Sequence, residues 1–315
     1  MKLVITGALG HIGSRLIREI PAGMFQEVDL IDNLSTQRYP VLFNLPKELP
    51  SRFFEEDILT ADLEKYFEGA DVVVHLAAIT NAEASVDSPE EVELTNFDGT
   101  ERVAKACVAT GSKLIFLSTT SVYGVQSDEV DEDCPFEQLQ PQSPYAESKL
   151  KAELLLQEMA KEEKLDFVIC RFGTIFGVST GMRFHTAVNK FCWQAAMGEP
   201  LTVWKTALNQ KRPYLDLMDA VDAMKFIIQR DLFDGRIYNV VTTNTTVGNI
   251  ADIISTHMPD LSINYVDSRI MNQLSYVVSN DRFAKLGFEF TGSLEQGIAD
   301  TLQLLNGVRR PGYQE

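Results

Sequence analysis

Gly7-Ala8-Leu9-Gly10-His11-Ile12-Gly13 decides the fold, because a short apolar run precedes it and a helical pattern follows it. The run, residues 2–6, is typical of a buried parallel strand, and residues 14–20 show helical periodicity. A strand that feeds a glycine-rich turn and then a helix presents backbone N–H groups to a pyrophosphate. The spacing is G-x-x-G-x-x-G instead of the commoner G-x-G-x-x-G, and a glycine triplet alone also fits a plain turn.

The second expected strand, residues 27–32, ends in Asp32, 19 residues after Gly13. A dinucleotide-binding fold has at this place a carboxylate that binds the adenosine ribose hydroxyls. The alternative is a loop acid that caps the next turn. Asp32 would repel a 2′-phosphate, and residues 33–35 (Asn-Leu-Ser) supply no arginine, so the sequence favours NAD over NADP.

Further strands and helices alternate along the first half of the chain. Strands are expected at 53–58, 71–78 and 113–117, and a helix at 88–110. His75 is expected to be a core histidine with satisfied hydrogen bonds, not a catalyst. Because ligand-type residues stand at the carboxyl ends of the strands, the sequence predicts an α/β fold, a doubly wound parallel (Rossmann) sheet with a smaller C-terminal α/β region.

Tyr145 and Lys149 belong to the stretch Ser143-Pro144-Tyr145-Ala146-Glu147-Ser148-Lys149, which begins a helix expected to end near residue 164. Residues four apart share one helix face. A free tyrosine, with a pKa of about 10, is a poor base, and a neighbouring ammonium favours its phenolate. Alone, this pair could be an ordinary surface contact.

The second half of the chain continues with an expected strand that ends at residues 171–172 and an exit loop at 173–177. A helix is expected at 186–197, a short strand at 201–204, helices at 218–230, 246–258 and 293–306, and a strand at 236–241. Arg183, Lys211 and Arg212 are candidates for a basic pocket that binds a diphosphate. The alternative is that these side chains are solvated at the surface.

Composition restricts the classes of partner. The 315 residues carry a net charge of −17, which argues against nucleic acid or an anionic membrane. No apolar run reaches the ~18 residues needed to span a bilayer, and the first residues are expected to form a strand instead of a signal peptide. The four cysteines and four histidines show no metal-site or disulfide spacing, which favours a reducing cytoplasm and no metal.

Taken in order, these motifs resemble the extended short-chain dehydrogenase/reductases, and within them the NAD-dependent epimerase/dehydratase group that acts on nucleotide sugars. The resemblance implies that Tyr145 is the acid/base and that Lys149 holds the nicotinamide ribose. It places the catalytic Ser/Thr at Thr119, with Ser118 or Thr120 as the alternative if the loop is shifted by one. Strand-end capping is another reading of this hydroxyl run.

The resemblance also implies the ligand contacts. The cofactor NAD would be bound by Gly7, Gly10, His11, Ile12, Gly13, Asp32, Asn33, Asp57, Ile58, Leu76, Ala77, Ala78, Asn96, Ser118, Tyr145, Lys149 and Phe172. A nucleotide-diphosphate sugar would be bound by Thr80, Thr119, Thr120, Arg183, Asn189, Val203, Arg212 and Tyr214. We expect two parts of the chain. Residues 1–172, to which residues 206–243 return, would form the NAD-binding domain. Residues 173–205 with 244–315 would form the substrate-binding region.

One departure narrows the expected chemistry. The 4,6-dehydratases of this group carry an Asp-Glu pair just after the catalytic threonine, where this chain has Thr120 and Ser121. Neither hydroxyl is a general acid or base at neutral pH, so epimerisation at C4 through a keto sugar is favoured. The alternatives are a nucleotide-sugar ketoreductase or dehydrogenase, a dehydratase, and a non-enzymatic NAD sensor. Relatives often dimerise through the helices at 88–110 and 145–164, so a homodimer is expected.

Overall fold

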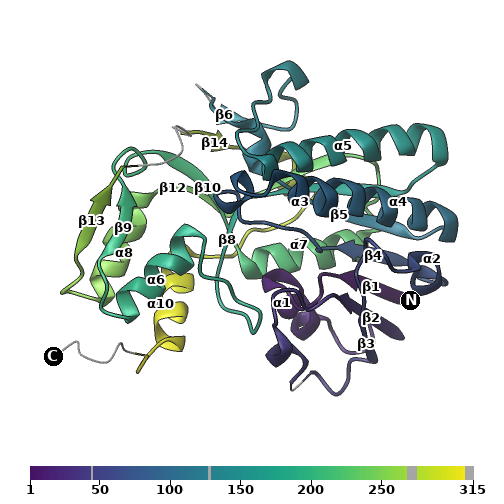
Figure 1. Cartoon of the computed structure of the whole chain (residues 1–315), viewed down its shortest axis with the longest axis horizontal. Helices are drawn as coiled ribbons and strands as arrows, with labels where there is room; N and C mark the ends of the chain where they lie inside the picture. The colour runs from purple at the N-terminus through teal and green to yellow at the C-terminus, as the bar shows by residue number, and fades with distance from the viewer. Residues whose placement is uncertain (44, 127–128, 268–274, 309–315) are drawn as a thin grey trace.

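The computed structural model describes residues 1–43, 45–126, 129–267 and 275–308. Within these ranges the centre of the molecule is a seven-stranded, all-parallel sheet in the order β11-β7-β5-β4-β1-β2-β3 (Figure 1). Its strands are β1 (Lys2–Thr6), β2 (Glu27–Asp32), β3 (Ser51–Glu55), β4 (Val72–His75), β5 (Lys113–Thr119), β7 (Phe167–Phe172) and β11 (Ile237–Val240). The strand order reverses between β1 and β4, which is where open α/β sheets form their ligand crevice.

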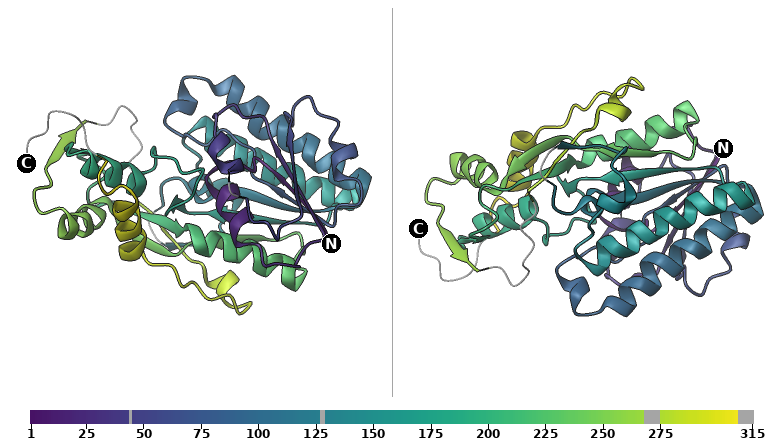
Figure 2. Two further views of the ribbon diagram at one scale, coloured as in Figure 1. Left: turned by 90° about the horizontal axis from the view of Figure 1, so that it is seen from below. Right: turned by 90° about the horizontal axis from the view of Figure 1, so that it is seen from above.

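Helices cover both faces of this sheet (Figure 2). One face carries α1 (His11–Glu19) and α7 (Leu217–Arg230), and the other carries α2 (Leu63–Phe67), α4 (Gly99–Thr110) and α5 (Pro144–Glu163). Along β1, Leu3 and Ile5 enter one core cluster while Val4 enters the other. Both faces of the strand are therefore apolar, which explains its continuous hydrophobic run. The prediction of a doubly wound parallel sheet is confirmed.

The helix expected at 88–110 is continuous but not uniform. It consists of α3 (Pro89–Glu93), a π-helical turn η3 (Leu94–Asp98) and α4. Such turns insert an extra residue into the helical ladder and turn one side chain out of the regular pattern. Here Asn96 lies in the π-helical turn and is fully buried.

The C-terminal region builds a second core beside the sheet. It contains α6 (Ala187–Ala196), α8 (Val247–His257) and α10 (Leu294–Leu304), with the strand pair β9 (Leu201–Trp204) and β13 (Ile263–Val266). Thr246 caps α8 by accepting a hydrogen bond from the Asn249 N–H. The short strands β6 (Glu129–Val130) and β14 (Val277–Val278) pair with each other, and α9 (Asp281–Ala284) follows β14.

The expectation of an exit loop at 173–177 is wrong in one respect, because this segment contains a strand. β8 (Thr174–Phe176) pairs in parallel with β10 (Lys211–Asp216), which pairs with β12 (Thr243–Thr246). A Cβ on Gly173 would lie 3.1 Å from the backbone of Tyr214, so the glycine lets the two strands approach. Three residues between glycines are too short to show a strand pattern in the sequence.

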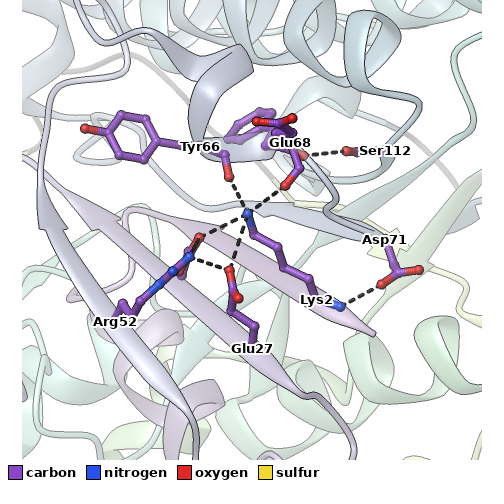
Figure 3. Close-up of polar contacts among 9 residues, drawn as sticks. Lys2, Glu27, Arg52, Tyr66, Glu68, Asp71 and Ser112 are labelled. Atoms are coloured by element: carbon purple, nitrogen blue, oxygen red, sulfur yellow. Dashed lines mark hydrogen bonds and ion pairs between the residues drawn. The ribbon is translucent and has the colours of Figure 1, made fainter.

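The amino ends of the strands carry a charged cluster (Figure 3). The Lys2 ammonium donates to the carbonyls of Tyr66 (2.9 Å) and Glu68 (2.8 Å) and lies 3.3 Å from the carboxylate of Asp29. Arg52 pairs with both oxygens of Asp29, which is only 1% exposed. The buried carboxylate is thus compensated, and this edge of the sheet is structural.

Cys107, Cys170 and Cys192 are buried. The expectation that His75 is a core histidine with satisfied hydrogen bonds is confirmed. His75 is buried and its two ring nitrogens bond to the hydroxyls of Thr6 (2.7 Å) and Thr100 (3.1 Å). Among the described helices, none combines the length and the apolar character required to cross a bilayer.

Candidate active site

A cavity of about 700 Å³ opens at the carboxyl ends of the parallel strands and extends towards the C-terminal region. Most residues expected to bind cofactor or substrate line it. These are Gly7, Gly10, His11, Ile12, Gly13, Asp32, Asn33, Asp57, Ile58, Leu76, Ala77, Ala78, Thr80, Ser118, Thr119, Tyr145, Lys149, Phe172, Arg183, Arg212 and Tyr214. The fold therefore brings residues from the ends of many strands and helices into one space.

The glycine loop is shaped by close backbone contacts. Gly7 has φ +66°, and a Cβ there would lie 2.5 Å from the amide nitrogen of Ala77, which follows the neighbouring strand β4. A Cβ on Gly13 would lie 2.4 Å from the carbonyl oxygen of Ala8. Both positions exclude any side chain, so the loop stays flat beneath the cavity and the amino end of α1 remains open to a ligand.

Asp32 holds the rim of the cavity next to this loop. Its carboxylate accepts hydrogen bonds from the Leu9 N–H (3.0 Å) and the Leu34 N–H (2.9 Å). Beside it, the Asn33 amide donates to Asp57 (3.0 Å), so both acids line the same end of the cavity. The Arg38 side chain also lines this end, and the charge of Asp32 raises its pKa against the effect of burial, which lowers it.

The proposed catalytic groups meet at the middle of the cavity. Tyr145 lies in the first turn of α5. The N-cap of this helix is Ser143, and the Ser143 hydroxyl accepts from the Ala146 N–H (3.2 Å). The phenol forms a hydrogen bond with Thr119 at the end of β5, and the Thr119 hydroxyl also accepts from the Ser121 N–H (3.1 Å). Thr119 is thereby fixed in orientation, and Ser118 beside it bonds to Glu153.

Burial dominates the titration of this site. It raises the pKa of the Tyr145 phenol, while the Arg183 guanidinium and the Thr119 hydroxyl lower that pKa. Burial also lowers the pKa of the Lys149 ammonium to about 7, against the charge of Glu153, which raises it. The ammonium lies 4.7 Å from the centre of the Phe116 ring. Lys149 thus titrates within the working range of an enzyme at neutral pH.

His11 connects the glycine loop to the C-terminal region. Its Nε2 lies 2.9 Å from the carbonyl oxygen of Gly177. Burial, helped by the charge of Arg183, lowers the pKa of His11 to about 3. The ring is therefore neutral at pH 7, and because a carbonyl only accepts, Nε2 must carry the hydrogen. Among the described residues the Nδ1 atom has no hydrogen-bond partner.

Cationic and aromatic side chains line the far end of the cavity. Arg183 donates to the Thr80 hydroxyl, and its Nε is buried without a hydrogen-bond partner in the described part of the chain. Arg212 and Tyr214 enter from β10, and Lys190 enters from α6. These cations give an acidic protein a local site for an anionic ligand.

Four of the expected ligand-binding residues do not line the cavity and instead support it. Asn96 accepts from the Ile79 N–H (2.8 Å) and donates to the Ile79 carbonyl (2.9 Å). Thr120 donates to the Phe172 carbonyl (3.3 Å). Asn189 donates to the Arg183 carbonyl (3.1 Å), and Val203 is 1% exposed in the third core cluster. Direct ligand contact by these four stays a prediction that the cavity lining does not support.

Sequence reasoning missed several lining residues. Thr202 and Trp204 flank Val203 on β9 and line the cavity, as the alternation of a half-buried strand could have indicated. Arg38 lies outside residues 33–35, which directly follow Asp32. It lines the cavity just before the turn η1 (Tyr39–Leu42). No local pattern marks Lys190 or His185, which reach the cavity only through the packing of the C-terminal region.

These residues fit a dinucleotide. The side-chain-free glycine loop leaves room for a pyrophosphate at the start of α1, and Asp32 presents a carboxylate for ribose hydroxyls. Lys149 lies where the cavity meets Tyr145, and its ammonium has three donors for a second ribose. No group of three or more His, Cys, Asp or Glu side chains that could hold a metal occurs within the described ranges.

Comparison with known proteins identifies the family. The model of the NAD dependent epimerase/dehydratase family matches residues 3–240. The uncharacterized UDP-glucose epimerase YtcB of Bacillus subtilis is 31% identical over 249 residues, which are 76% of this chain and 76% of that protein. The solved structure of the UDP-glucuronic acid 4-epimerase of Bacillus cereus, in complex with UDP-glucuronic acid and NAD, superposes with a TM-score of 0.89. It is 26% identical and covers 97% of this chain and 99% of its own.

Longer relatives also match. The trifunctional UDP-glucose 4,6-dehydratase/UDP-4-keto-6-deoxy-D-glucose 3,5-epimerase/UDP-4-keto-L-rhamnose-reductase RHM3 of Arabidopsis thaliana is 29% identical over 320 residues. The match covers 96% of this chain but 46% of RHM3, so the chain spans about half the length of that relative. With the family model matching most of its length, the chain belongs to the NAD-dependent epimerase/dehydratase family of extended short-chain dehydrogenase/reductases.

Proposed function

We propose that the protein is a nucleotide-sugar epimerase that inverts C4 through a transient keto sugar. The observation that carries this proposal is the single acid/base centre of the cavity, Tyr145 bonded to Thr119, with neutral hydroxyls at the next two positions. Such a centre moves one proton to and from one sugar oxygen. The named relatives and the Bacillus cereus enzyme support nucleotide sugars as the substrate class.

In this mechanism Tyr145, as phenolate, removes the proton from the O4 hydroxyl and later returns it. Thr119 orients the same oxygen through its hydroxyl, and Lys149 favours the phenolate by its charge. NAD, when bound, supplies the redox chemistry by accepting a hydride from C4 and giving it back. Arg183 and Arg212 anchor the diphosphate, so the keto sugar can turn and present its other face to the same centre.

The 4,6-dehydratases use an Asp-Glu pair directly after the catalytic threonine, where this chain has Thr120 and Ser121. The Thr120 hydroxyl bonds to the Phe172 carbonyl, and both Thr120 and Ser121 form hydrogen bonds with the buried phenol of Tyr276. Neither hydroxyl is a general acid or base at neutral pH. A ketoreductase or dehydrogenase would use the same Tyr145 and Lys149, so it is the closer alternative.

The first test is NMR of the purified protein with UDP-, GDP-, CDP- and dTDP-sugars and no added cofactor. The panel includes UDP-glucuronic acid, which is the ligand in the Bacillus cereus structure. A stereoisomer that forms without added cofactor supports the epimerase, and a 6-deoxy-4-keto product indicates a dehydratase. Turnover that begins only when NADH or NADPH is supplied would replace the proposal by a reductase.

We also propose a homodimer formed through α3, α4 and α5. These helices lie side by side on one face of the sheet (Figure 2). Leu154 on this surface is 42% exposed, which is high for a leucine side chain. Sedimentation equilibrium should give a mass of two chains at micromolar concentration, and Leu154→Glu should reduce it to one. A mass of one chain for the unaltered protein would contradict the dimer.

A further inference from the structure

A buried ion pair lies directly behind the proposed catalytic groups. Glu153 and Arg171 are 1% and 3% exposed, and the Arg171 Nη2 lies 2.6 Å from the Glu153 Oε2, with Nε 3.0 Å from Oε1. The Ser118 hydroxyl donates to the same Glu153 Oε1. One carboxylate therefore connects α5 with the ends of β5 and β7, the two strands on either side of it.

This pair is not explained by stability alone. A buried ion pair often contributes no more than apolar residues of the same volume, because both charges lose their hydration. Arg171 also leaves its Nη1 without a hydrogen-bond partner among the described residues and lies 4.8 Å from the centre of the Tyr123 ring. The groups on which these two charges act therefore matter more than the stability that the pair contributes.

The negative member of the pair faces Lys149. Tyr145, Lys149 and Glu153 follow at steps of four on α5 and so share one face of the helix. From the sheet, β4 contributes His75, whose pKa burial lowers to about 3, and β5 contributes the Phe116 ring. Arg171 lies behind Glu153 on β7. Burial lowers the pKa of the Lys149 ammonium, and the Glu153 carboxylate raises it.

We propose that Glu153, held in place by Arg171, is a positioning residue that keeps Lys149 charged and fixes the strand end that carries Thr119. Burial alone would favour a neutral lysine, and a neutral lysine would no longer favour the phenolate of Tyr145. The bond from Ser118 holds the backbone directly before Thr119. The inference rests on the proposed acid/base role of Tyr145 and Lys149, but its test does not require turnover.

The test is a direct titration of Lys149 in the full chain saturated with NAD. Lysine labelled with ¹³C at Cε gives one resonance for each lysine, and Lys149→Arg identifies the relevant one. In the double variant Glu153→Met and Arg171→Met, which replaces the pair by side chains of similar volume, the Lys149 midpoint should fall by about one pH unit. Glu153→Asp retains the anion and should keep most of the original midpoint.

A matched control uses an exposed ion pair away from α3, α4 and α5. Beside α9, Lys285 lies 3.3 Å from Asp281, and both side chains are largely exposed. Asp281→Asn should leave the Lys149 midpoint unchanged, because solvent screens that charge. If the double variant does not fold, Glu153→Gln combined with Arg171→Met removes both charges, retains an oxygen that can accept from Ser118, and gives the same reading.

Activity supplies the second readout. A lower Lys149 midpoint should reduce kcat about tenfold on the alkaline side of the pH profile and leave the acidic side unchanged. An unshifted midpoint in the double variant overturns the inference and leaves Glu153 a structural residue. If no nucleotide sugar is turned over, the proposed function fails, and the NMR titration still decides whether Glu153 sets the charge of Lys149.

Discussion

The Arg183 guanidinium acts on the Tyr145 phenol and lowers its pKa, opposing the burial that raises it. The same pairing raises the pKa of Arg183, which burial lowers to about 10. Arg183 comes from the segment between β8 and α6, far along the chain from α5. The sequence indicated Lys149 as the cation beside Tyr145, and the structure adds Arg183, from a different part of the chain, as a second one.

Replacement of Arg183 by Gln should move the acidic limb of the pH profile of kcat to higher pH. Without the guanidinium the pKa of Tyr145 rises, so the phenolate forms only at higher pH. Arg183→Lys should restore part of the shift. The control is Arg236→Gln, since Arg236 pairs with Asp234 at an exposed site. A limb that stays in place in Arg183→Gln would show that Arg183 does not act on Tyr145.

Tyr145→Phe should abolish most of the turnover while leaving the fold and the NAD affinity nearly unchanged. Loss of a general acid/base typically costs about 10²–10⁴ in rate. The conversion is followed by NMR, and NAD binding by calorimetry. Tyr265→Phe, at a tyrosine that is 46% exposed on β13, is the matched control and should keep full activity. Turnover above a tenth of the original in Tyr145→Phe would assign the chemistry to another group.

Gly7→Ala should destabilise the protein by more than the same change at Gly69. Both glycines have nearly equal positive φ, +66° and +69°. An alanine at either position would lose about 1 kcal/mol of stability, because a residue with a Cβ is strained at positive φ. Only Gly7 would also place a Cβ 2.5 Å from Ala77, whereas nothing lies within 4 Å at Gly69. Urea unfolding should therefore show a further loss of about 1–3 kcal/mol for Gly7→Ala. Equal losses would mean that the loop relaxes without cost.

Asp32→Ser should weaken the binding of NADH and lower the ratio of the affinity for NADH to the affinity for NADPH. The carboxylate that repels a 2′-phosphate is removed, and Arg38 on the same rim loses its acidic neighbour and becomes available for that phosphate. Fluorescence titrations with both nucleotides measure the ratio of affinities. In the double variant with Arg38→Gln the affinity for NADPH should fall again. An unchanged ratio in Asp32→Ser would remove Asp32 from cofactor selection.

The sequence by itself determined the large sheet and the place of the glycine loop. Parallel strands buried on both faces are continuous apolar runs, so β1 and β2 were predicted with the bounds that the structure has. The helix that carries Tyr145 and Lys149 was equally visible, because its spacing and its proline are local features. Each of these signals lies within about 20 residues of chain.

Only the tertiary structure decided which distant side chains meet. Arg183 reaches Thr80, Asn96 binds the backbone of Ile79, and Glu153 joins Ser118 to Arg171, all across many positions of the chain. Periodicity records which face of an element is buried, but not which neighbour covers it. That choice depends on how strands and helices pack, and the packing places the charges that set the titration of Tyr145 and Lys149.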